Sequence, residues 1–192
     1  MASKTTLKRG FKANAERLAN QYRKEMGIHP CNPLCAFKLA EHLRVPIYKA
    51  SEFLTSVEEQ KKLAGIETDD SGWSALTMLT KEGNQIIIHN DFHNPARQQS
   101  NIMHEIAHIV CDHKIESVNY PFAIPLGMRD FNKAQEDEAI YLGATLQLSK
   151  PCLLWSLKRK FSLQDISQEY NASEEMVRFR LNTTGLSKRL FS

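Results

Sequence analysis

The segment His104-Glu105-Ile106-Ala107-His108 contains the residues of this chain best suited to chemistry. The two histidines lie four positions apart, so on a helix both imidazoles face one side and can reach the same metal ion. Glu105 follows the first histidine, and its carboxylate can accept a proton from water at the open side of that ion. The pattern predicts a zinc site with two ligands and a general base. A pair of helix-surface histidines is the plainer alternative.

A catalytic zinc ion needs a third ligand from the protein and an open position for water. The motif H-E-x-x-H-x-x-G-x-x-H would supply a third histidine, but Cys111 and Lys114 stand where it requires glycine and histidine. The remaining source is a carboxylate on a later helix, and residues 136–138 are three acids in a row. An ordinary acidic first turn, favoured by the helix dipole, is the alternative explanation of that run.

Helical phase distinguishes the acids of this run. Glu136 shares a face with Ala139 and Gly143, three and seven residues later. Small residues on that face allow a close approach to the histidine helix, whereas Glu138 lies on a different face. We therefore expect Glu136 to be the third ligand, with Glu138 as the second choice or as a residue that supports the site.

Further histidines lie on either side of the motif. His89 and His93 are four apart, but they fall in a strand-to-loop region that does not hold two rings together, so we do not expect a second metal site there. A long irregular stretch, residues 112–130, carries His113 and Tyr120. Either could stabilise an oxyanion, and the spacing selects neither.

Apolar periodicity and turn residues predict the elements that position these side chains. The predicted helices cover residues 11–26, 33–43, 56–64, 94–110 and 132–148, with two or three short helices between 152 and 186. Asn32 and Asn94 are the expected N-caps of two of them, each followed by a proline at the first helical position. Two strands, 75–79 and 85–89, are predicted to form a hairpin through a short loop that contains Gly83.

The second strand of this hairpin includes the apolar run Ile86, Ile87 and Ile88, followed by His89. We expect it to be an edge strand beside the site. An edge strand can hold an extended peptide by main-chain hydrogen bonds, so these four residues are the candidates for substrate binding.

The C-terminal residues 161–186 can be read as a helix-turn-helix, with residues 171–173 as the turn. The second helix carries only Arg178, Arg180 and Asn182 as candidates for contacting DNA. A structural role for these helices is therefore the favoured interpretation.

Composition limits the classes of function. The chain has 192 residues, 42% of them hydrophobic and 24% charged, which suits one domain or one domain with a small appendage. The net charge of +3 is too small to predict nucleic-acid binding, and the basic runs 158–160 and 188–189 are expected to be solvated. No apolar run approaches the roughly 20 residues of a membrane span and no signal peptide is recognisable, so we expect a cytoplasmic protein with four reduced cysteines.

The chain resembles the ImmA/IrrE family of metallopeptidases. The resemblance rests on three groups of residues: 86–90 and 96–98 running into 102–108; 136–139 followed by 142–146; and the tail 166–186. The opening helix and residues 33–45 are also similar to the family's N-terminus. Ile140 stands where the family usually has asparagine, and Ser149 where its helix commonly ends in proline, which affects the end of the ligand helix rather than the ligands.

This resemblance implies an α+β fold, a zincin-like minimal metallopeptidase core of the gluzincin type. Such a core combines a small sheet or hairpin with the helix of the metal motif and a ligand helix, here in residues 1–150, with residues 151–192 as a helical segment packed on the same domain. It also implies one zinc ion per chain, with His104, His108 and Glu136 as ligands and Glu105 as the base.

The resemblance further implies a protein substrate. Family members cleave helix-turn-helix repressors that control mobile elements or stress responses, and some belong to toxin–antitoxin-like pairs. We therefore expect a zinc-dependent endopeptidase that cuts a helix-turn-helix repressor or antitoxin-like partner encoded nearby. The alternatives are a DNA- or repressor-binding module, and a toxin that acts through the same zinc site.

Overall fold

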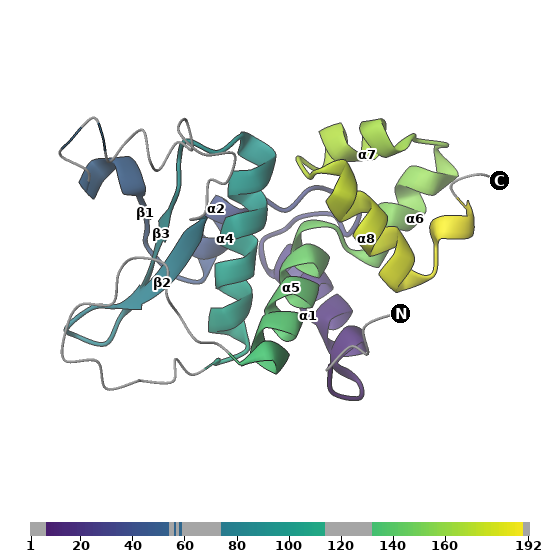
Figure 1. Cartoon of the computed structure of the whole chain (residues 1–192). Coiled ribbons are helices and arrows are strands. Elements are labelled where there is room, and N and C mark those ends of the chain that lie inside the picture. The colour runs from purple at the N-terminus through teal and green to yellow at the C-terminus, as the bar shows by residue number, and fades with distance from the viewer. Residues whose placement is uncertain (1–6, 54–55, 57, 59–73, 114–131, 190–192) are drawn as a thin grey trace.

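The protein is α+β, with a small sheet beside a group of helices (Figure 1). The computed structural model describes residues 7–53, 56, 58, 74–113 and 132–189. The strands are β1 (Ile47–Lys49), β2 (Ala75–Leu79) and β3 (Gln85–His89), and the α-helices are α1 (Phe11–Glu25), α2 (Ala36–His42), α4 (Pro95–Val110), α5 (Lys133–Gln147), α6 (Lys150–Lys158), α7 (Leu163–Glu169) and α8 (Glu174–Thr184). None of the helices in these ranges is long and apolar enough to cross a membrane.

The sheet has the order β1-β3-β2, with β3 parallel to β1 and antiparallel to β2. The predicted hairpin of β2 and β3 is confirmed at its predicted bounds, and Gly83 in its turn has a φ of 81°. The expectation that residues 86–89 form an edge strand is wrong. The short strand β1 pairs with the other side of β3, so both sides of the β3 backbone are used within the sheet. The structure therefore does not support the prediction that a substrate binds to the main chain of Ile86, Ile87, Ile88 and His89.

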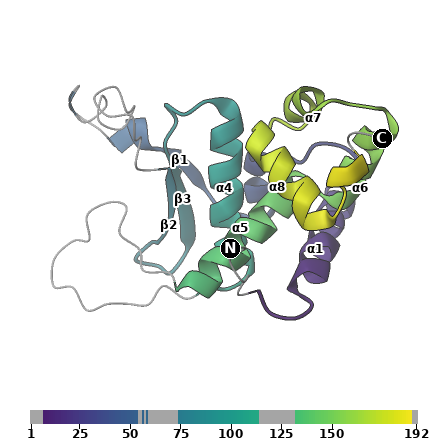
Figure 2. The same ribbon diagram turned by 45° about the vertical axis from the view of Figure 1, so that its right-hand side comes forward.

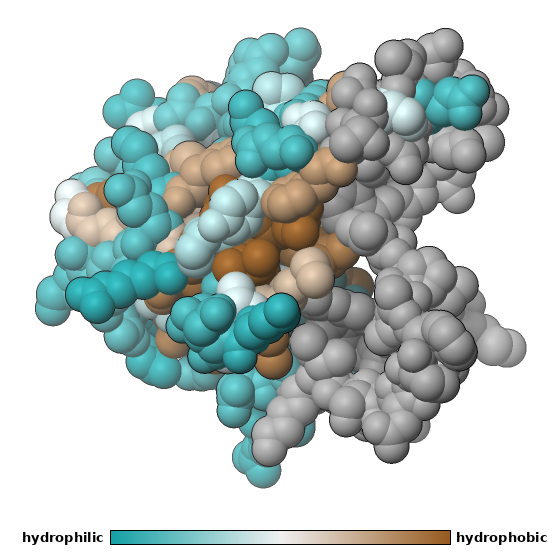
Figure 3. Space-filling view, turned by 90° about the vertical axis from the view of Figure 1, so that its left-hand side faces the viewer, coloured by the Kyte–Doolittle hydropathy of each residue, from teal (hydrophilic) through white to brown (hydrophobic). Residues whose placement is uncertain are grey.

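The two faces of the sheet have different neighbours. Ile87 is fully buried in the main core with α4, while Ile88 forms a small cluster on the opposite face with Leu76 and Ala50. This opposite face also carries exposed apolar side chains, among them Tyr48 and Met78. Figure 3 views the molecule from this side and shows apolar residues gathered on it.

Helix α4 begins where the sequence predicts. Asn94 is its N-cap, and its side-chain oxygen accepts a hydrogen bond from the backbone N–H of Arg97, 2.9 Å away. Ile102, Met103 and Ile106 recur at helical spacing and are fully buried. These apolar side chains place α4 between the sheet and α5 (Figures 1 and 2).

Helix α5 lies close against α4. Asn132 and Gln135 form a reciprocal capping box at its start. A Cβ atom added at Gly143 would lie 3.0 Å from the carbonyl oxygen of Met103 and 3.1 Å from the Cα atom of His104. The predicted close approach at Gly143 is therefore confirmed, and it occurs at the first histidine of the motif.

Helix α2 starts later than predicted. It begins at Ala36, so Asn32 is not its N-cap and Pro33 is not its first residue. The backbone N–H of Ala36 donates instead to the side-chain oxygen of Gln99 on α4, at 2.7 Å. The preceding Leu34 is buried in the main core. The sequence did not predict this start, because Gln99, which caps the helix, lies far away along the chain.

The C-terminal helices α6, α7 and α8 have a second hydrophobic cluster, built around Leu153, Ile166 and Val177. Ser162 and Ser173 cap α7 and α8 through their side chains. The four cysteines are free thiols, in agreement with the sequence. The predicted helix over 56–64 and the stretch 112–130 fall almost entirely outside the described residues, and the domain boundary after residue 150 stays a prediction.

Candidate metal centre

Three side chains from α4 and α5 converge at the place where these helices approach each other. The Nε2 atoms of His104 and His108 are 3.0 Å apart. One carboxylate oxygen of Glu136 lies 3.3 Å from Nε2 of His104, and the other lies 3.5 Å from Nε2 of His108. In the described part of the chain this is the group of His, Cys, Asp and Glu residues close enough to hold a metal ion.

The chemistry of these three groups fits a zinc ion. Bonds of about 2.0–2.1 Å in tetrahedral geometry place ligand atoms roughly 3.3 Å apart, near the three observed separations. Two neutral imidazole nitrogens and a carboxylate are also a ligand set typical of catalytic zinc. The His108 side chain is 3% exposed, whereas those of His104 and Glu136 are 28% and 36% exposed. The cluster is therefore reachable from one side, as an open coordination position requires.

Glu136 is held in its charged form by its neighbours. A hydrogen bond from His104 lowers the pKa of the Glu136 carboxyl, and this effect outweighs the opposing effect of burial. A carboxylate that stays ionised is available as a metal ligand.

Glu105 is buried beside the cluster, on the side of α4 that faces the sheet. Its side chain accepts a hydrogen bond of 2.7 Å from the hydroxyl of Thr77 on β2. Both residues are largely buried, at 7% and 5% exposure. Sequence reasoning did not identify Thr77. The available signal was the alternation of strand residues, which turns Thr77 toward α4 while Leu76 faces away.

His113 and Glu138 form a pair behind His108. Nδ1 of His113 is 3.0 Å from Nδ1 of His108, and its Nε2 is 3.1 Å from a carboxylate oxygen of Glu138. The structure therefore places His113 against the buried side of His108, whereas the sequence offered it only as an oxyanion candidate. Tyr120, the other oxyanion candidate, lies outside the described residues.

The other two histidines of interest lie apart from this cluster. His89 is buried at the end of β3, and burial lowers its pKa. The ring of His93 is close to two amide side chains, with its Nε2 3.3 Å from Asn90 and its Nδ1 3.1 Å from Asn101. Burial lowers the pKa of His93 as well. Both rings thus stay neutral at ordinary pH, with His89 packed edge-on against Phe37 of α2 and His93 beside Asn101 of α4.

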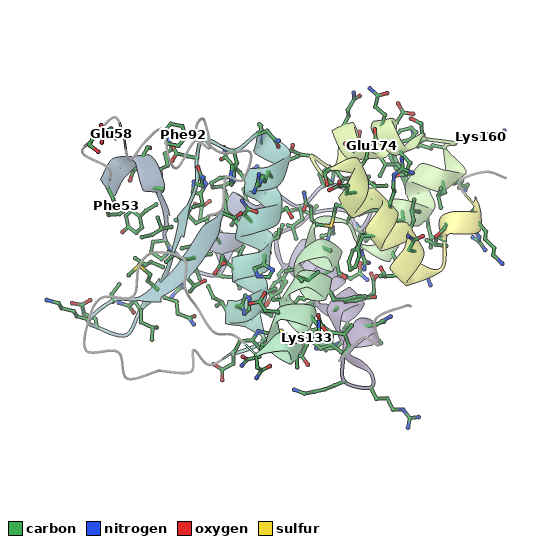
Figure 4. The ribbon with its side chains drawn as sticks, viewed as in Figure 1. Phe53, Glu58, Phe92, Lys133, Lys160 and Glu174 are labelled. Atoms are coloured by element: carbon green, nitrogen blue, oxygen red, sulfur yellow. The ribbon has the colours of Figure 1, made fainter. Side chains whose placement is uncertain are left out.

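The arginines of α8 are committed to contacts within the chain. Arg180 is fully buried and pairs with Glu16 of α1. Arg178 pairs with Glu174, which lies with Glu175 in the first turn of α8 (Figure 4). In helix-turn-helix proteins the start of the second helix contacts the bases, and here that start carries two carboxylates that phosphate groups would repel.

Residues 59–182 match the family model of the IrrE N-terminal-like domain, peptidase M78. A transcriptional regulator from Mycobacterium tuberculosis has a similar fold, with a TM-score of 0.56 and 12% identity. The alignment covers 88% of this chain and 46% of the regulator, so this chain spans less than half the length of that protein. A comparison with curated proteins found no match.

Proposed function

Because this chain belongs to the peptidase M78 family of IrrE N-terminal-like domains, we propose that it is a zinc-dependent endopeptidase with a zincin-like core. In this proposal His104, His108 and Glu136 are the metal ligands and Glu105 is the general base. The observation that carries the proposal is the convergence of two imidazole nitrogens and one carboxylate within 4.8 Å of one another. One zinc ion per chain would bind there.

Bound zinc would polarise the scissile carbonyl and make a nearby water more acidic. Glu105 would accept the proton of the attacking water on its carboxylate and then deliver it to the amine that leaves. The hydrogen bond from Thr77 orients the carboxylate of Glu105. Burial of both side chains strengthens that hydrogen bond by excluding water.

The strand best placed to receive an extended substrate is β2. It pairs only with β3 among the described strands, so it has one unpaired edge in that part of the chain. It also carries Thr77, which touches Glu105. A peptide that adds to this edge by main-chain hydrogen bonds would pass beside the base.

The proposed substrate is a cytoplasmic helix-turn-helix repressor or an antitoxin-like partner, as the resemblance to the ImmA/IrrE family implies. Co-expression with the products of neighbouring genes tests this choice, scored by mass spectrometry for a fragment cut at one position. A partner that stays intact beside the wild-type protein, while unrelated proteins are cut, would contradict it.

Glu105→Gln tests the mechanism. The amide keeps the size of the side chain but cannot accept the proton, so we expect cleavage to fall by about 10²–10⁴-fold while the zinc content stays at one ion per chain. His104→Ala and His108→Ala should lose the zinc as well as the activity. Cleavage by Glu105→Gln at the wild-type rate would overturn the role of Glu105, and full zinc content in both histidine variants would overturn the site.

A further inference from the structure

We propose that His113 and Glu138 act as positioning residues for the metal centre, by holding the ring of His108 in the tautomer and orientation that present Nε2 to the metal. This inference rests on the proposed function. Its basis is a continuous row of polar atoms, in which Nδ1 of His108 meets Nδ1 of His113 at 3.0 Å and Nε2 of His113 meets Glu138 at 3.1 Å.

The placement of protons along this row has one solution with neutral rings. Glu138 accepts, so Nε2 of His113 must carry its proton and donate it. In a neutral ring Nδ1 of His113 then has a lone pair and accepts. The facing Nδ1 of His108 must therefore be the donor, and this leaves the lone pair of the His108 Nε2 atom directed at His104 and Glu136. That is the tautomer a metal ligand needs.

The end of α4 places His113 in this position. Asp112 has a φ of 51°, a left-handed conformation that ends the helix, and the backbone N–H of His113 donates to the carbonyl oxygen of His108 at 3.0 Å. This bond turns the chain back over the last helical turn. The ring of His113 consequently lies over that of His108, with centroids 5.0 Å apart.

Burial of His113 and Glu138 limits the partners that their polar atoms can have. The side chains of His113 and Glu138 are 5% and 7% exposed. A buried carboxylate is costly unless it is hydrogen-bonded or paired, and Glu138 meets this requirement through His113 on one oxygen and Lys8 on the other, at 3.5 Å. Since His113 occupies one of its oxygens, Glu138 supports the site from behind while Glu136 faces the histidine pair.

The test compares the zinc affinities of His113→Phe and Glu138→Gln with that of the wild-type protein, by competition with a chromogenic zinc chelator. Removing a hydrogen-bond partner of a zinc-bound histidine typically weakens binding by about 10–100-fold, and we expect that range for both variants. His42→Phe is the matched control, because His42 also pairs with a glutamate, Glu25, at 3.1 Å, but outside the cluster. It should bind zinc within about twofold of the wild type.

Side-chain ¹⁵N spectra of histidine in the zinc-loaded wild-type protein give a second readout. We expect a protonated Nδ1 in His108, and in His113 a protonated Nε2 with a bare Nδ1. In Glu138→Gln the His113 pattern should become a mixture of tautomers, a change that lost packing alone would not cause. A His113 ring with its proton on Nδ1 in the wild type would overturn the inference.

The outcomes separate the inference from the function on which it rests. If the wild type binds zinc through His104 and His108 but His113→Phe and Glu138→Gln bind it equally tightly, the positioning role is overturned and the zinc site stands. If the wild type binds no zinc, both fall. If His113→Phe fails to fold by circular dichroism, the isosteric Glu138→Gln decides.

Discussion

Glu105 depends on a neighbour that comes from another part of the chain. The hydroxyl of Thr77 donates to its carboxylate, and both groups are buried. Thr77→Val keeps the shape of the side chain and removes the donor. We expect cleavage to fall by roughly tenfold, the usual scale for losing a group that orients a reactive one, with zinc affinity unchanged. Steady-state cleavage and chelator competition measure the two effects.

Thr145→Val is the matched control for this variant. Thr145 is also buried, but its hydroxyl donates to the carbonyl oxygen of Tyr141 one turn earlier in the same helix. Its replacement should leave cleavage within about twofold of the wild type. Equal loss of activity in both variants would show that buried hydroxyls matter here only for packing.

Cys111 gives a prediction about reactivity at the end of α4. Burial, reinforced by the charge of Glu138, raises the pKa of its thiol to about 11. Because the thiolate is the reactive form, only about 10⁻⁴ of this thiol is ionised at pH 7. We expect Cys111 to alkylate far more slowly in the native protein than in the urea-unfolded chain, measured by mass spectrometry of the labelled peptide. Equal rates in the two states would refute the partial burial of Cys111 that the structure shows.

Residues within one helix could be predicted from spacing, and residues brought in from elsewhere could not. His104, Glu105 and His108 are neighbours on α4 by helical geometry alone, and the small residue Gly143 correctly indicated where α5 approaches. Thr77 reaches the site through the order of the strands, and His113 through the turn after α4. Strand alternation indicates which face of β2 carries Thr77 but not that this face meets Glu105, and the position of His113 has no signature in the local sequence.

At the scale of elements, the contact between α4 and α5 determines the geometry of the metal centre. Gly143 leaves room for the α4 backbone at His104, where an added Cβ would lie 3.0–3.1 Å from backbone atoms that cannot move as a side chain can. In an exposed helix a change from glycine to alanine stabilises by about 1 kcal/mol. Here we expect Gly143→Ala to destabilise by about 1–3 kcal/mol through overpacking.

Two measurements check the Gly143→Ala prediction. Urea unfolding reports the loss of stability, and chelator competition should show weaker zinc binding because His104 and Glu136 lie on the helices that are pushed apart. An unchanged or increased free energy of unfolding would mean that the helices separate at no cost, and that the close approach is not needed.

Local sequence patterns predicted some elements correctly and others incorrectly. Asparagine caps and turn residues predicted α4 and the hairpin well, since these interactions form between residues close in sequence. The start of α2 was predicted three residues too early because its cap is Gln99, on another helix. The position of β3 in the sheet was predicted wrongly because it depends on a three-residue strand, β1, whose sequence has little periodicity.

At the scale of the whole molecule, buried polar side chains join the C-terminal helices to the rest. The buried side chain of Gln147 at the end of α5 donates to the carbonyl oxygen of Asn171, after α7, at 2.7 Å. The hydroxyl of Tyr170, after α7, donates to the carbonyl oxygen of Cys31 at 2.7 Å. Such links cross between the two hydrophobic clusters, so we expect the described parts of the chain to unfold together rather than in steps.

Arg180 offers the sharpest test of this coupling. Its guanidinium is fully buried, donates to the carbonyl oxygen of Leu148, pairs with Glu16 and lies over the ring of Tyr141. Arg180→Met leaves the carbonyl group of Leu148 without this donor and leaves Glu16 with the backbone N–H of Lys150 but no positive charge, and breaking a buried pair from one side costs about 3–5 kcal/mol. We expect a loss of that size, in a single urea transition followed by both tryptophan fluorescence and circular dichroism.

Arg178 is the control, two residues away on the same helix. It also pairs with a glutamate, but the side chains of Arg178 and Glu174 are 57% and 49% exposed, and exposed pairs contribute about 0–1 kcal/mol. Arg178→Met should therefore shift the free energy of unfolding by less than about 0.5 kcal/mol. If the two variants destabilise equally, burial of Arg180 does not tie α8 to the rest of the fold. If Arg180→Met unfolds in two separate steps, the C-terminal helices are an independent unit that is merely attached to the metal-binding part.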